Sequence, residues 1–91
     1  MALWVAKATI MPKPGVNDPQ GEAILGGLSS LEFGAVRQVR AGKQIMITLE
    51  AGGRDEAIAE VERMCEQLLA NPVIEIYSVS AEAADTAEVT A

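Results

Sequence analysis

The chain has 91 residues, of which 49% are hydrophobic, and its formal net charge is −6. This length corresponds to a single domain, no apolar run approaches the ~18 residues needed to cross a bilayer, and the N-terminus has no signal-peptide pattern. We therefore expect a cytoplasmic protein. Its acidic charge argues against nucleic acid or an anionic membrane as a partner.

The residue types on which most enzymes depend are scarce in this chain. There is no histidine, and the single cysteine, Cys65, has neither an imidazole base to activate it nor a partner for a disulfide. No glycine-rich phosphate-binding pattern is present. We therefore predict that the chain carries no catalytic, cofactor-binding or metal-ligating residue.

The first half of the chain predicts a strand, a helix and a second strand. Residues 3–10 alternate in polarity as a strand does. A helix is expected to begin with Asp18 as its N-cap and Pro19 in its first turn, and to end near Phe33. Residues 36–40 are then predicted to form the second strand, followed by a turn at Ala41-Gly42.

The second half repeats the pattern in the order strand, helix, strand. Residues 44–50 are expected to form the third strand, and residues 54–70 a helix that ends at Asn71-Pro72. Residues 73–80 form the predicted fourth strand. The expected domain therefore spans residues 1–80, and the acidic residues 81–91 are predicted to be a flexible tail.

The order βαββαβ predicts an α+β, ferredoxin-like fold, with a four-stranded antiparallel sheet and two helices on one face. The other face should then be polar, yet every alternating strand leaves apolar residues on both faces. Such a sheet is expected to be covered on its second face, and we predict that a second copy of the chain covers it in a homodimer. The candidate dimer-interface residues are Leu3, Val5, Met46 and Ile76.

Two further features allow either a contact or an ordinary structural interpretation. Gly26 and Gly27 lie inside the first predicted helix, where each costs roughly 0.5–1 kcal/mol relative to alanine. Either a close approach to the sheet or to a neighbouring subunit offsets this cost, or a stable helix tolerates it. Arg37, Arg40 and Lys43 cluster near the predicted turn, either as a contact for an anion or an acidic partner or as solvated charges that discourage aggregation at a sheet edge.

Three stretches resemble the PurS family of phosphoribosylformylglycinamidine synthase subunits. They are KPGVNDPQG at residues 13–21, VRAGK at residues 39–43 and MCEQLLANPVIEIY at residues 64–77, in the family's order and spacing. The sequence departs from the family at a few positions, including Glu32, where a glycine is common. Gly34 is expected to end the first helix instead.

The resemblance implies a non-catalytic subunit of an enzyme complex in purine biosynthesis. In that complex a glutaminase subunit releases ammonia from glutamine, and a synthetase subunit uses ATP and Mg²⁺ to make formylglycinamidine ribonucleotide. The small subunit is implied to bridge the two, as a homodimer or a dimer of dimers, and to aid ammonia transfer. It is implied to bind no cofactor itself.

The candidate contact residues for these partner subunits come from the same three stretches. They are Lys13, Pro14, Gln20, Gly21, Arg40, Lys43 and Asn71.

An alternative hypothesis is a small-ligand-binding regulatory module, because ferredoxin-like domains serve many functions.

Overall fold

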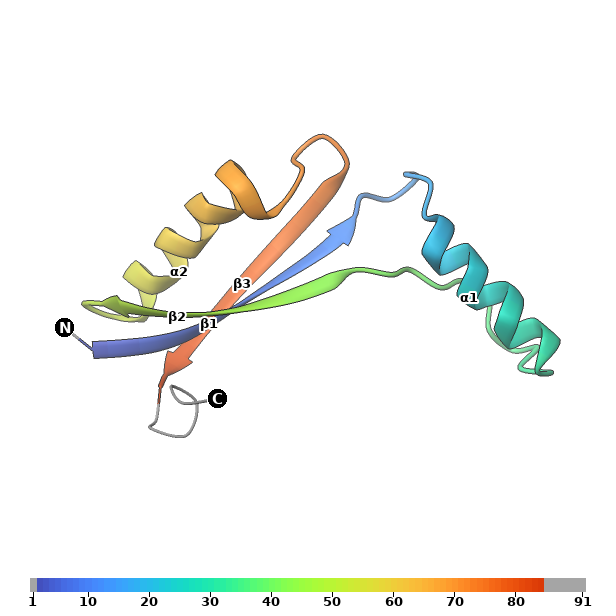
Figure 1. Ribbon diagram of the computed structural model, residues 1–91, viewed down its shortest axis with the longest axis horizontal. Helices are drawn as coiled ribbons and strands as arrows, with labels where there is room; N and C mark the ends of the chain where they lie inside the picture. Colours follow the sequence, from blue (N-terminus) through green and yellow to red (C-terminus); the bar gives the residue numbers. More distant parts are fainter. Residues whose placement is uncertain (1, 85–91) are drawn as a thin grey trace.

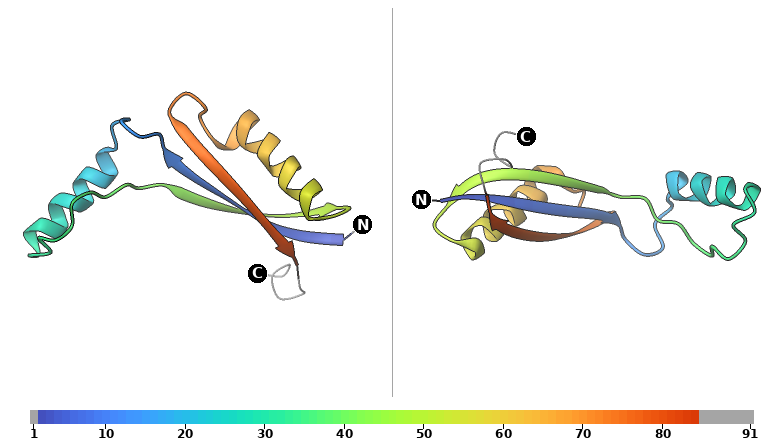
Figure 2. Two further views of the ribbon diagram at one scale, coloured as in Figure 1. Left: turned by 180° about the vertical axis from the view of Figure 1, so that it is seen from behind. Right: turned by 90° about the horizontal axis from the view of Figure 1, so that it is seen from below.

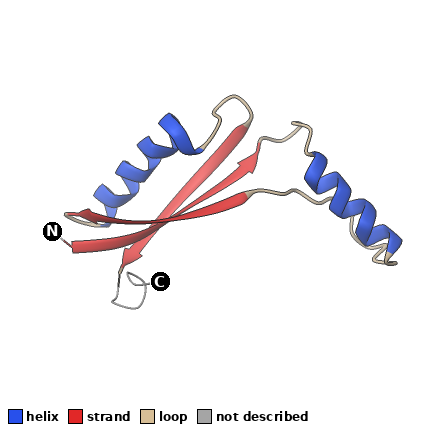
Figure 3. Cartoon of the chain, viewed as in Figure 1, coloured by secondary structure: helices blue, strands red, loops and turns tan. Residues whose placement is uncertain are grey.

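The computed structural model describes residues 2–84, which form one antiparallel sheet and two helices. The strands are β1 (Ala2–Pro12), β2 (Lys43–Ala51) and β3 (Glu75–Ala83). Their order in the sheet is β2-β1-β3, so β1 is paired along both edges (Figure 1, Figure 3). The α+β class and the antiparallel sheet are thus confirmed, with three strands in place of the predicted four.

The two helices have very different surroundings. Helix α2 (Arg54–Met64) continues into a π-helical turn, η1 (Cys65–Leu69), and packs on one face of the sheet. Helix α1 (Pro19–Ser30) projects beyond the end of the sheet and covers neither face (Figures 1 and 2). The prediction that both helices cover one face is therefore wrong for α1.

The core lies between α2 and the face of the sheet that α2 covers. Ala6, Ala8 and Ile10 of β1 are fully buried there against Val61 and Cys65. Alternate residues of the neighbouring strands complete this layer, because paired residues share a face of the sheet. These partly buried residues are Ile45, Ile47, Leu49, Tyr77, Val79 and Ala81.

The predicted second strand, residues 36–40, is extended but pairs with no strand in the described part of the chain. Its prediction as a strand of this chain's sheet is therefore wrong. The physical reason is that Ala41-Gly42 does not form a tight turn, so the chain runs straight from residue 36 into β2 instead of folding back beside it (Figure 1).

The ends of the other elements lie close to their predicted positions. Asp18 caps α1 and Pro19 begins it, as predicted. The helix ends at Ser30, where Glu32 adopts the left-handed φ of 71° that glycine usually supplies. Strand β3 continues to Ala83, past the predicted end at residue 80, and the rest of the predicted tail, residues 85–91, lies outside the described residues.

The projecting helix gives the molecule an elongated shape. Its extents are 51 × 31 × 17 Å and its radius of gyration is 16.6 Å, whereas a compact domain of this length has about 12 Å. Within residues 2–84, no helix is long and apolar enough to cross a membrane.

Candidate interaction site at the neck

Three strand ends lie together at one end of the sheet. Strand β1 ends there at Pro12, β2 begins there at Lys43, and β3 begins there at Glu75. Two segments, residues 13–18 and 39–42, run side by side from this end to α1, and we call them the neck (Figure 1). Because both segments belong to stretches that resemble the PurS family, the neck is the first candidate site.

Asp18 joins the two segments of the neck. Its Oδ1 accepts a hydrogen bond from the backbone N–H of Gly21 at 3.0 Å, which is the predicted helix cap. Its Oδ2 accepts a second from the N–H of Ala41, 2.8 Å away and 23 residues along the chain. These hydrogen bonds, with that from Ala41 contributing most, lower the pKa of Asp18, and the nearby charge of Arg40 acts in the same direction.

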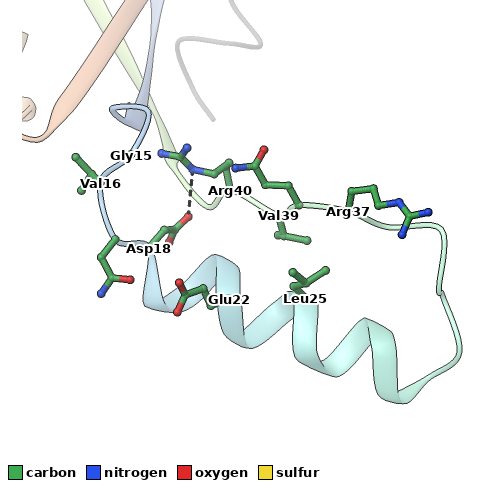
Figure 4. A pocket seen from close by; sticks show the side chains of 10 residues that line it. Gly15, Val16, Asp18, Glu22, Leu25, Arg37, Val39 and Arg40 are labelled. Atoms are coloured by element: carbon green, nitrogen blue, oxygen red, sulfur yellow. Dashed lines mark ion pairs between the residues drawn. The ribbon is translucent and has the colours of Figure 1, made fainter.

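Arg40 fastens the neck to the end of β1. Its Nη2 donates to the carbonyl oxygens of Pro12 and Lys13, at 2.9 and 2.8 Å. Its Nε lies 3.8 Å from Oδ2 of Asp18, an ion pair between two half-buried side chains (Figure 4). The guanidinium therefore contacts groups of its own chain, which gives Arg40 a structural role.

Two glycines allow the backbone segments of the neck to approach closely. A Cβ on Gly21 would overlap the carbonyl oxygen of Val39 and the carboxylate of Asp18. A Cβ on Gly42 would overlap the carbonyl oxygen of Ile10 and the sulfur of Met11. Neither glycine has a positive φ. The neck therefore needs glycine at these two positions because a side chain would not fit, and not because the backbone there adopts a conformation that other residues avoid.

The turn that precedes β3 packs against the start of the neck. The backbone N–H of Lys13 donates to the carbonyl of Ile74 at 2.8 Å. Asn71 closes the turn, since its side-chain oxygen accepts from the N–H of Val73 and its carbonyl accepts from Glu75. Val73 is 76% exposed at the tip of this turn. All three stretches that resemble the family therefore meet at one end of the sheet.

The structure brings most of the predicted partner-contact residues to this region. Gly21 is buried under Val39, while Lys13 and Arg40 are half-buried. Gln20 is exposed on the first turn of α1, and within residues 2–84 neither its side chain nor that of Lys13 makes a hydrogen bond. The remaining candidates are also exposed: Pro14, Lys43 and Asn71.

Sequence reasoning missed the long-range part of the neck. Asp18 was identified as a helix cap, but its bond to Ala41 and the close packing of Val39 on Gly21 were not predicted. No local pattern signals these contacts, because they join residues that are far apart in the sequence. Only the shared family resemblance of the two stretches pointed to both segments.

A shallow pocket of about 420 Å³ lies between the neck and α1 (Figure 4). It is the feature on which the hypothesis of a small-ligand module would depend. Its inner charged groups, Asp18 and Arg40, form an ion pair with each other and hydrogen bonds with the backbone, which leaves the exposed Glu22 and Arg37 to recognise a ligand. The pocket therefore offers a ligand few charged groups that are not already paired within the described chain.

The titratable groups of α2 and η1 form no catalytic arrangement. Burial raises the pKa of the Cys65 thiol, and Glu62 and Glu66 raise it further, so the thiol stays protonated and unreactive. The Tyr77 hydroxyl donates to Glu66 at 2.9 Å, and this bond raises the pKa of Tyr77. Across the described residues, no group of three or more histidine, cysteine or acidic side chains is placed to hold a metal ion.

Residues 2–84 form a small α+β domain in which the three family-like stretches meet at the neck. A family model described as "PurS: Phosphoribosylformylglycinamidine (FGAM) synthase" matches residues 5–83. The chain therefore belongs to the PurS family, and the resemblance found from its sequence is confirmed.

Two known relatives match this chain along nearly their whole length. Phosphoribosylformylglycinamidine synthase subunit PurS of Archaeoglobus fulgidus is 48% identical over 75 residues, which cover 82% of this chain and 94% of the relative. The Bacillus subtilis subunit of the same name is 40% identical over 80 residues, covering 88% of this chain and 94% of the relative.

Solved structures show the same fold. A structure described as PurLQS from Thermotoga maritima contains a chain that is 34% identical and matches with a TM-score of 0.81, covering 90% of this chain and 100% of that one. Thermus thermophilus PurS matches with a TM-score of 0.81 at 36% identity, covering 91% of this chain and 99% of that one.

Proposed function

We propose that this chain joins the glutaminase and the ATP-dependent synthetase of phosphoribosylformylglycinamidine synthase and thereby aids the transfer of ammonia between them. As a member of the PurS family it is a subunit of that enzyme in purine biosynthesis. The observation that carries the proposal is the match of 90% of this chain to a chain in a structure described as PurLQS. In this proposal, ATP and Mg²⁺ bind to the synthetase subunit.

The neck is the surface that best suits a contact with those subunits. It is fixed by the bonds of Asp18 and Arg40, so a partner would meet a preformed surface and little conformational entropy would be lost on binding. The side chains of Lys13 and Gln20 have no structural task within the described chain, which leaves them available for recognition.

We expect the double substitution Lys13→Glu, Gln20→Ala to weaken assembly without unfolding the chain. The measurement is co-purification with the glutaminase and synthetase subunits in the presence of glutamine and MgADP. Reversing one charge and removing one amide at an interface typically weakens binding by about tenfold or more. The matched control is Arg63→Glu, Gln67→Ala on the exposed side of α2 and η1, which makes the same change of charge.

Unchanged recovery of the complex with Lys13→Glu, Gln20→Ala would show that the neck is architectural and that the partners bind elsewhere. Failure of the unsubstituted chain to co-purify with both subunits would contradict the proposed function itself.

The sheet face that α2 leaves open is a second proposed surface, at which two copies pair. The four candidate residues lie on this one face, since Lys7 pairs with Met46 and Met11 pairs with Ile76 on the side opposite Ile10. Val5 is already buried within its own chain, whereas Leu3, Met46 and Ile76 are 39%, 59% and 49% exposed. These three side chains would lose contact with water in a face-to-face dimer.

We expect Met46→Glu, Ile76→Glu to lower the mass of the assembly in light scattering, because the new carboxylates would face each other across the dimer. The matched control is Leu68→Glu, which changes a side chain that is 83% exposed on η1. An unsubstituted chain that is monomeric at micromolar concentration would contradict pairing through this face.

A further inference from the structure

Strand β3 lies at one edge of the sheet and pairs only with β1 among residues 2–84, in an uninterrupted register. Just before this ladder, the N–H of Lys13 donates to the carbonyl of Ile74. Just after it, the N–H of Ala84 donates to the carbonyl of Leu3. Because hydrogen-bonded pairs alternate in an antiparallel ladder, the even-numbered residues of β3 bond to β1, and the odd-numbered residues direct their N–H and C=O groups outward.

The outward-directed backbone groups in the middle of β3 belong to Tyr77, Val79 and Ala81, which we call the outer edge. Their side chains lie in the layer under α2, beside residues of β1 that are fully buried. The three side chains of the outer edge are only half-buried. One further strand on this side would therefore pair the backbone groups and cover the exposed parts of the side chains.

Strand β3 lacks the features that usually protect an edge strand from pairing, which are lysine, proline, a bulge or short length. It has nine residues, contains no lysine, proline or glycine, and keeps its register with β1 throughout. Its only charged residues, Glu75 and Glu82, lie near its two ends, so residues 76–81 form a regular and uncharged edge. Edges of this kind bind extended segments of other chains by strand addition.

The surroundings of the outer edge are acidic. Helix α2 and η1 pack on the sheet over β3, and the Tyr77 hydroxyl donates to Glu66 of η1 at 2.9 Å. This hydrogen bond raises the pKa of Tyr77, and the charge of Glu62 acts in the same direction, which places Glu62 near the same strand. Together with Glu75 and Glu82, four acidic side chains therefore surround the outer edge.

We propose that the outer edge of β3 binds an extended segment of a partner subunit as an additional strand, and that this segment carries lysine or arginine. That the partner is a subunit of the same enzyme rests on the proposed function. The residue of the segment opposite Tyr77 has its side chain on the face covered by α2, because directly paired residues share a face of a sheet. A basic side chain at that position lies beside Glu66 and neutralises it.

The position of the outer edge suits a partner that also contacts the neck. Strand β3 begins at Glu75, directly after Ile74, whose carbonyl oxygen accepts from the N–H of Lys13 in the neck. A segment that passes Lys13 can therefore continue along β3 without leaving the surface of the chain.

A basic segment is favoured over a second copy of this chain because of the acidic surroundings. If two copies paired edge to edge through β3, twofold symmetry would bring Glu62 and Glu66 of both copies to the same side of the joined sheet. Like charges placed close together are destabilising. The residues that follow in the sequence, 85–91, include Asp85 and Glu88 and no basic residue, so their charge does not match this edge either.

The first test is amide hydrogen exchange of the chain, alone and with the separately purified glutaminase and synthetase subunits in the presence of glutamine and MgADP. In the chain alone, we expect fast exchange at Tyr77, Val79 and Ala81 and slow exchange at Ser78 and Ser80, whose N–H groups bond to β1. With the partner that supplies the segment, exchange at the three outer-edge amides should slow at least about tenfold.

Each outcome of this exchange experiment decides the proposal. Co-purification with both subunits but no added protection at the outer edge would overturn the strand addition and leave the proposed function intact. Failure to co-purify would contradict both. Slow exchange at the outer edge in the chain alone would show that its own C-terminal residues or a second copy cover this edge, and the proposal would be wrong.

The second test concerns the charge of the segment. Glu62→Gln, Glu66→Gln removes two charges and leaves an acceptor for the Tyr77 hydroxyl. We expect it to weaken binding of that partner about fivefold at low ionic strength, with a smaller difference in added salt. The control Glu32→Gln, Glu50→Gln removes two exposed charges away from β3 and should leave binding unchanged. Equal affinities for the two double variants would show that the segment is not basic.

Discussion

Gly21→Ala is expected to destabilise the chain by about 1–3 kcal/mol, although alanine is the better helix former. Gly21 lies in the first turn of α1 and is buried. The added Cβ would overlap the carbonyl oxygen of Val39 on one side and the carboxylate of Asp18 on the other. Neither obstacle is the end of a flexible side chain, since the first is a backbone oxygen and the second, the carboxylate of Asp18, accepts hydrogen bonds from the N–H groups of Gly21 and Ala41. The substitution therefore has to separate α1 from the neck.

The matched control for this prediction is Gly26→Ala in the same helix. A Cβ on Gly26 would meet nothing within 4 Å in the described chain, so alanine there should stabilise α1 by about 0.5–1 kcal/mol. Urea denaturation of both variants, at one protein concentration because association affects apparent stability, measures the difference. If both substitutions stabilise the chain, the close approach of Val39 to Gly21 does not exist in solution.

This pair of glycines shows which part of the fold the sequence could predict. Local patterns were sufficient for the limits of most elements: the cap at Asp18, the start of α1 at Pro19, and the strands β1 and β2. Nothing local distinguishes Gly21 from Gly26. Their different environments arise from a segment about 18 residues later in the chain, and periodicity carries no information about such a contact.

The missing fourth strand has a similar explanation. The residues at 36–40 have the composition of a strand and adopt an extended conformation. Whether they pair depends on the path of the chain at Ala41-Gly42, where the N–H of Ala41 donates to Asp18 and the neighbouring Arg40 donates to the carbonyl oxygen of Pro12. The pattern therefore predicted the conformation of the segment but not its position beside β2.

The candidate site was predicted in outline for a different reason. Family resemblance selected the three stretches that meet at the neck, and the structure gives several of their residues internal tasks. Arg40 and Gly21 hold the neck together, whereas Lys13 and Gln20 have no such task for their side chains. Sequence could not separate these two groups, because an architectural residue and a recognition residue can belong to the same motif.

Ile10→Ala is expected to have the largest effect of the single substitutions considered, about 2–5 kcal/mol. Ile10 is fully buried on the central strand and packs in the core with Val61 and Cys65. Its removal would leave a cavity that a three-stranded sheet with one covering helix has few side chains to fill. Only Met11 and Pro12 separate Ile10 from the neck, and the carbonyl oxygen of Ile10 lies against Gly42.

The control for Ile10→Ala is Ile74→Ala, the same deletion at a residue that is 42% exposed and whose carbonyl still accepts from Lys13. We expect this control to cost less than about 1 kcal/mol in the same denaturation experiment. If Ile10→Ala also costs less than about 1 kcal/mol, the core is not where the structure places it. A large cost at Ile10, accompanied by faster amide exchange at Ala41, would show that the central strand and the neck are stabilised together. The surface that we propose for contact with the partner subunits would then depend on the core of the sheet.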